Sequence, residues 1–75
     1  MNQSEYTQFY NGLRRYALSR ASRLFSDRVL REDAVDKAMD RVVDWLITNQ
    51  EVNSLEAFCK TIISNSLKIM MQVVL

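Results

Sequence analysis

Residues 54–72, SLEAFCKTIISNSLKIMMQ, decide the fold that we expect for this chain. Polar side chains recur in this stretch at every fourth position, and apolar side chains oppose them around a helix. The polar positions are Glu56, Lys60, Ser64, Lys68 and Gln72. The opposing apolar positions are Leu55, Phe58, Ile62, Ile69 and Val73. This pattern is typical of an amphipathic α-helix, and Asn53 with Glu56 predicts a capping box at its start.

Two more helices are predicted upstream, over about residues 4–25 and 31–48, from the same three- and four-residue spacing. Asn2 with Glu5, or Ser4 itself, is expected to cap the first of them. The pair Ser26-Asp27 marks the break between the two helices. We therefore expect an all-α fold in which the three helices share one core. The predicted core residues are Leu13, Leu24, Val35, Val42, Leu46, Phe58 and Ile62.

The composition agrees with a small helical unit. The chain has 75 residues, 48% of them hydrophobic, with one Gly and no Pro, which favours a compact helical domain over disorder or β-structure. We expect one domain over residues 1–75. The net charge of +1 argues against a strong grip on nucleic-acid phosphates by the isolated chain.

No residue pattern indicates catalysis or a cofactor. The chain has no His, no Gly-rich phosphate loop, and a single cysteine, Cys59, without partners at metal-ligand spacing. We interpret Cys59 as a small core residue rather than a nucleophile. A lone cysteine, a polar N-terminus and an apolar tail far shorter than the ~20 residues of a membrane span favour a soluble, cytoplasmic protein.

An acidic face runs along the second predicted helix. Its residues recur three and four positions apart and are Asp33, Asp36, Asp40 and Asp44, with Lys37 and Arg41 alongside. Asp is a poor helix former and like charges four residues apart repel, so this face costs helix stability. Two interpretations stay open, a plain solvated face and a docking surface for a basic partner.

The arginines of the first predicted helix also have two interpretations. Arg20 falls within the apolar stripe of that helix and is expected to extend to solvent or to pair with a carboxylate of another helix. Arg14, Arg15 and Arg23 lie outside the stripe, where contact with phosphate groups and ordinary exposure are both open.

Taken together, DAVD at residues 33–36 and SLEAFCKTIISN at residues 54–65 resemble the core of region 2 of bacterial sigma factors of the extracytoplasmic-function group. Members of that group carry an acidic helix that starts with a similar motif, followed by a helix with Ser, an aromatic residue, Ile and Asn at fixed spacing. The matching positions of the later helix are Ser54, Leu55, Ala57, Phe58, Ile62 and Asn65. The resemblance spans about residues 6–69 and implies a three-helix sigma region 2-like bundle, stand-alone or truncated, without the second, promoter-reading domain.

The resemblance also implies a function, which is to direct or modulate transcription initiation. It implies that the second helix docks on the clamp coiled coil of the RNA polymerase β′ subunit through Asp33, Asp36, Lys37, Asp40, Arg41 and Asp44. It implies that the third helix contacts an unstacked strand of the −10 promoter element, in complex with polymerase, through Lys60, Asn65 and Lys68. With Phe58 expected in the core, the third helix has no exposed aromatic residue for stacking on bases.

Two alternatives remain open. One is a region 2 mimic that inhibits polymerase without contacting DNA. The other is a helical interaction protein that assembles as a homodimer or hetero-complex through its C-terminal helix. Consecutive helix residues point about 100° apart, so the apolar tail cannot face a single core with all its side chains. Those side chains are Ile69, Met70, Met71, Val73, Val74 and Leu75.

Overall fold

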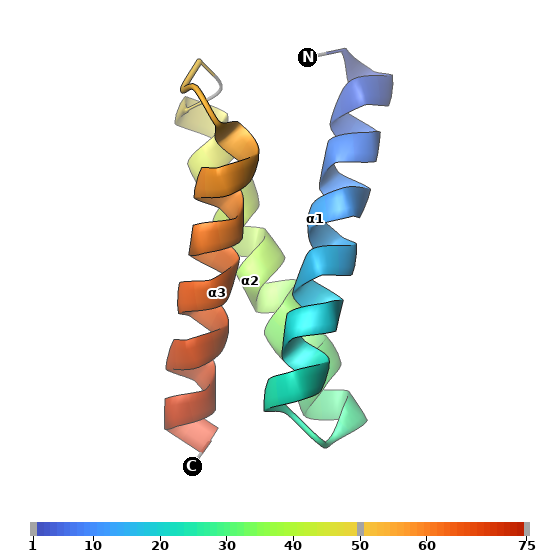
Figure 1. The fold of residues 1–75 in the computed structure, drawn as a ribbon, viewed down its shortest axis with the longest axis vertical. Helices are drawn as coiled ribbons and strands as arrows, with labels where there is room; N and C mark the ends of the chain where they lie inside the picture. The colour runs from blue at the N-terminus through green and yellow to red at the C-terminus, as the bar shows by residue number, and fades with distance from the viewer. Residues whose placement is uncertain (1, 50, 75) are drawn as a thin grey trace.

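The chain folds into three α-helices in the computed structural model, which describes residues 2–49 and 51–74, with side chains up to residue 72 (Figure 1). Helix α1 spans Gln3–Leu24, α2 spans Arg28–Thr48 and α3 spans Leu55–Val74. Over these described ranges there is no β-strand, which confirms the prediction of an all-α protein with three helices. None of the helices, within the same ranges, is long and apolar enough to cross a membrane.

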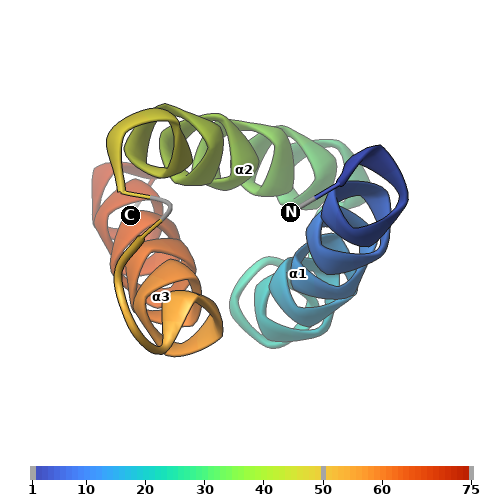
Figure 2. The same cartoon turned by 90° about the horizontal axis from the view of Figure 1, so that it is seen from above.

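The three helices all contact one another. In Figure 1, α1 and α3 lie in front and α2 crosses behind them. In the view from above in Figure 2, α2 lies along one side of the bundle, and α1 and α3 lie at its two ends. The α1–α2 turn and the C-terminal end of α3 lie at one end of the bundle. The α2–α3 connection and the N-terminal end of α1 lie at the other.

Side-chain caps explain where the first two helices begin. Asn2 Oδ1 accepts a hydrogen bond of 2.8 Å from the backbone N–H of Glu5, which confirms Asn2 as the cap of α1. Asp27 Oδ1 accepts the N–H groups of Val29 and Leu30 at 2.8 and 3.1 Å. Helix α2 therefore begins at Arg28, three residues before the predicted start. The cap satisfies the N–H groups of the first turn, so the helix can begin before the first apolar residue of its buried side.

The start of α3 differs from the predicted capping box. The carboxylate of Glu56 accepts a 3.2 Å contact from Lys60 Nζ, one turn further along the helix. Among the described residues no hydrogen bond joins Asn53 and Glu56, so the predicted box is wrong. Ser54 instead enters the helix from the left-handed region, with a φ of 62°, which turns the chain sharply into α3.

The core confirms most of the predicted residues. Leu13, Val35, Val42 and Leu46 are buried between the helices. Leu24 and Ile62 are only partly buried and pack against the edge of that core. These four buried positions come from α1 and α2. The side of each of these two helices that faces the core was therefore correctly predicted.

The predicted buried face of α3 is wrong. Phe58 is 49% exposed and Ile69 is 48% exposed, whereas the core receives Cys59, Ile63 and Leu67. The buried face is turned by about one residue, or 100°, from the predicted stripe. Helix α3 packs against both α1 and α2, so the side that faces both helices is buried, and Phe58 lies outside that side. The predicted stripe position Val73 has a side chain outside the described part of the chain.

Candidate interaction surfaces

The four aspartates of α2 form one exposed surface, which we call the acidic ridge: Asp33, Asp36, Asp40 and Asp44. Their spacing of three and four residues aligns them along one side of the helix. Lys37 and Arg41 are also exposed beside the ridge. All six residues predicted from the resemblance for polymerase binding therefore lie at the surface of one helix, within reach of a single partner.

Two of the ridge carboxylates already have cationic partners. Arg14 Nη1 of α1 lies 3.0 Å from Asp36 Oδ1, and Lys37 Nζ lies 3.0 Å from Asp33 Oδ2 within α2. Such solvent-exposed pairs stabilise a protein by only ~0.2–1 kcal/mol, so a competing cation can replace either partner. Asp40 and Asp44 have no ion pair among the residues that the structure describes. The least neutralised part of the ridge is thus the second half of α2.

The residues predicted to contact DNA do not share one site. Lys60 Nζ forms an ion pair with Glu56 Oε1 at 3.2 Å and lies over the Tyr16 ring, 5.1 Å from the ring centroid. Asn65 is exposed but is turned about 140° around the helix axis from Lys60. Lys68 lines a groove between α3 and α1. Only Lys60 and Lys68 point to the same broad side of α3.

That groove, which we call the basic groove, is formed by residues from α1 and α3 and has a volume of about 240 Å³. Its lining residues are Arg20, Arg23, Leu24, Ser64, Leu67 and Lys68. Leu24 and Leu67 supply the apolar part of its lining, and none of the described residues that line it has a carboxylate. Three basic residues from two helices therefore line one groove, an arrangement that was not predicted from the sequence.

Tyr16 supports one side of this groove. Its hydroxyl lies 3.2 Å from Ser64 Oγ, which joins α1 to α3. The Arg20 guanidinium lies over the same ring, with Cζ 5.7 Å from the centroid. No carboxylate partner of Arg20 is found over residues 2–49 and 51–74. Of the two predictions made for Arg20, the ion pair with another helix is therefore wrong. The arginine of α1 that reaches a carboxylate on another helix is Arg14.

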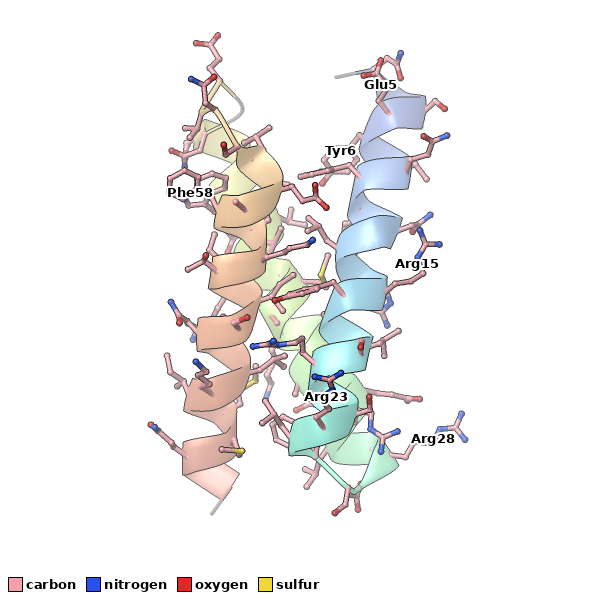
Figure 3. The ribbon with its side chains drawn as sticks, viewed as in Figure 1. Glu5, Tyr6, Arg15, Arg23, Arg28 and Phe58 are labelled. Carbon is pink, nitrogen blue, oxygen red and sulfur yellow. The ribbon has the colours of Figure 1, made fainter. Side chains whose placement is uncertain are left out.

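A stacked aromatic pair lies near the α2–α3 connection, with Phe58 exposed and Trp45 partly buried. The rings of Trp45 and Phe58 stack with centroids 5.7 Å apart and planes inclined by 23°. Figure 3 shows Phe58 on the side of α3 away from α1. The expectation that α3 offers no exposed aromatic residue is therefore wrong, for the same reason that the buried face of α3 was misassigned. The pair nevertheless lies away from Lys60, which is turned about 200° around the helix from Phe58.

Cys59 is fully buried, which confirms its interpretation as a core residue. Burial without a charged partner disfavours the thiolate and raises the pKa of the Cys59 thiol above its ordinary value. A protonated, inaccessible thiol is a poor nucleophile. Within the described part of the chain, no three His, Cys, Asp or Glu residues are grouped closely enough to hold a metal ion.

Comparison with known protein families, with curated proteins and with solved structures finds no match to this chain. Its function therefore has to be argued from the acidic ridge, the basic groove and the resemblance carried by residues 33–36 and 54–65.

Proposed function

We propose that this chain is a sigma region 2-like module that binds RNA polymerase through the acidic ridge and thereby directs or modulates transcription initiation. The observation that carries the proposal is the exposure of Asp33, Asp36, Asp40 and Asp44 along one side of α2. The partner implied by the resemblance is the clamp coiled coil of the β′ subunit. The sigma-like packing of the three helices is part of the same proposal.

The acidic ridge costs helix stability in the chain on its own. Four aspartates at helical spacing repel one another and are poor helix formers, and only Asp33 and Asp36 are offset by exposed ion pairs. A basic partner surface relieves this repulsion and accelerates association by electrostatic steering. Because Asp36 is held by a partly exposed Arg14, a partner cation can take over that carboxylate without unfolding the chain.

Charge reversal tests the ridge. The double variant Asp36→Lys, Asp40→Lys is expected to bind purified polymerase from the native host at least about tenfold more weakly, since close interfacial charge pairs are worth ~1.5 kcal/mol or more each. The matched control is Glu5→Lys, Glu51→Lys, which makes the same charge change at two exposed sites outside the ridge. Affinity is measured by calorimetry across a salt series, with helicity checked by circular dichroism. Equal affinities of wild type and ridge variant at every salt concentration reject the ridge as the docking surface.

Contact with promoter DNA is the second part of the proposal, and it separates the sigma-like function from an inhibitory mimic. Lys60 and Lys68 share a side of α3, and an unstacked −10 strand held by polymerase is their proposed ligand, with Asn65 at its edge. Permanganate footprinting of promoter complexes distinguishes the two. Strand opening that requires the chain supports the sigma-like function, whereas polymerase binding with suppressed opening supports the mimic.

A further inference from the structure

We propose that the basic groove between α1 and α3 is a binding site for a phosphate-bearing ligand. Arg20 and Arg23 supply one wall from α1, and Ser64 and Lys68 supply the other from α3. These groups offer two guanidinium forks, one ammonium group and one hydroxyl, which together are the usual donors to phosphate oxygens.

The charge balance of the groove favours an anion. Four ion pairs are found among the described residues, and none of them includes a cation of the groove. The four pairs are Arg14–Asp36, Arg28–Glu32, Lys37–Asp33 and Lys60–Glu56. Like charges that line one groove repel one another, and a dianion bound between them replaces this repulsion by attraction. Arginine is especially suited to this role because its planar fork binds two phosphate oxygens at once.

The walls of the groove are positioned in advance. The Tyr16 hydroxyl is hydrogen-bonded with Ser64 Oγ at 3.2 Å, and the Arg20 guanidinium lies against the Tyr16 ring. One aromatic side chain therefore restrains a residue on each wall, which lowers the entropy cost of ordering them around a ligand. Leu24 and Leu67 also line the groove, and an apolar lining strengthens the attraction between the basic residues and an anion.

The size of the groove limits the ligand. Its volume of about 240 Å³ is below the ~300–1,000 Å³ of sites that enclose a drug-sized molecule. The ligand is thus either a small phosphate compound, such as pyrophosphate or the phosphate end of a mononucleotide, or a longer strand that inserts one phosphate-bearing portion. Both sources share the phosphate chemistry, and the test distinguishes them.

Titration of the full chain tests this site with three probes, namely inorganic pyrophosphate, adenosine monophosphate and a short single-stranded oligothymidylate. We expect saturable binding of at least one probe. Arg20→Gln and Arg23→Gln should each weaken it at least about tenfold, because each removes a guanidinium that donates charge-assisted hydrogen bonds to phosphate. Arg15→Gln is the matched control, since it removes the same charge from the same helix. In Figure 3, Arg15 and Arg28 point away from α3. The control variant should change the affinity less than about twofold.

The outcomes separate the sources of phosphate. Binding of the two small probes with loss in Arg20→Gln supports a free phosphate compound. Binding of the oligothymidylate that pyrophosphate displaces supports a strand. The proposal is overturned if no probe binds saturably, if Arg15→Gln weakens binding as much as the groove variants, or if binding survives in the Arg20→Gln, Arg23→Gln double variant. Circular dichroism checks folding, and the exposed Lys68→Gln tests the other wall if an arginine variant does not fold.

This inference goes beyond the proposed function. The groove lies between α1 and α3, whereas the acidic ridge lies on α2, and the titration contains no polymerase. Loss of phosphate binding and loss of polymerase binding are therefore measured separately. Lys68 belongs to both the groove and the proposed DNA contacts, so oligothymidylate binding that depends on Arg20 and Arg23 would add two residues of α1 to those contacts.

Discussion

Phe58 and Ile63 show how strongly the position of one side chain around α3 decides its contribution to stability. Ile63 is fully buried, whereas Phe58 is half exposed and stacks on Trp45. We predict that Ile63→Ala lowers the free energy of unfolding by about 2–5 kcal/mol, through lost burial and the cavity left behind. Phe58→Ala should cost about 1 kcal/mol, close to the value of one aromatic pair. Urea denaturation of both variants measures the difference, and a larger loss for Phe58→Ala would contradict the assigned core.

Cys59 gives a second prediction, on the dependence of stability on pH. Burial raises the pKa of the Cys59 thiol in the folded chain, so the folded state retains its proton to a higher pH than the unfolded state does. The stabilising contribution is therefore complete below the unfolded pKa and is lost as pH rises through the folded pKa. Unfolding curves between neutral and alkaline pH should show this decline in wild type and a smaller one in Cys59→Ala. Thiol labelling should be slow in buffer and rapid in urea, and fast labelling of the native chain would show that the thiol is accessible.

At the scale of the elements, Asp27 determines where α2 begins. Its carboxylate accepts two backbone N–H groups, from Val29 and Leu30, that otherwise have no partner in the first turn. We predict that Asp27→Ala lowers the free energy of unfolding by about 1 kcal/mol, within the ~0.5–2 kcal/mol range of capping residues. Ser26→Ala, at the exposed neighbouring position, is the control and should change stability by less than about 0.5 kcal/mol. Thermal and urea unfolding give both values, and equal effects of the two variants would show that the cap is energetically unimportant.

The helices could be predicted from the sequence because spacing and capping act locally. Asn2 and the stripes of α1 and α2 lie within a few turns of the groups that they satisfy. The buried side of α3 could not be predicted in this way, since Phe58, Ile62, Ile63 and Leu67 are all apolar and give two overlapping stripes. Simultaneous packing against α1 and α2 selects one of them. The basic groove could not be predicted from the sequence either. It forms between two helices, where residues such as Tyr16 and Ser64 are in contact although they are 48 positions apart.

At the scale of the whole molecule, a net charge of +1 conceals two charged surfaces of opposite sign. The ridge aspartates lie on α2, and the basic residues of the groove lie between α1 and α3. An even distribution of the same charges would give little long-range attraction for any partner. Separation of the charges permits a basic partner and an anionic ligand to associate with different faces of one small bundle, each in a salt-dependent manner.

An apolar surface at one end of the bundle leads to the last prediction, which concerns assembly. Leu30 and Ile69 are 40% and 48% exposed and line a groove of about 260 Å³ with Phe25, Ala34 and Met70. The charged residues Asp33, Lys37 and Arg41 of α2 also line this groove. Met70 and Met71 pack against the core, and the side chains of Val73, Val74 and Leu75 lie outside the described residues. Full burial of one such side chain is worth ~1.5–3 kcal/mol, so covering several of them by a second copy favours a homodimer.

Sedimentation at micromolar concentration measures this association. We expect the wild-type chain to form a dimer and Ile69→Asp to shift it toward monomer, because a carboxylate in an apolar contact loses its hydration without gaining a partner. Ile47→Asp is the matched control. Ile47 is 68% exposed and lies near the end of α2, at the opposite end of the bundle from Ile69, so its substitution should leave the dimer intact. A wild-type chain that stays monomeric rejects the homodimer. A control variant that dissociates as much as Ile69→Asp shows that the dimer does not form specifically through this apolar end.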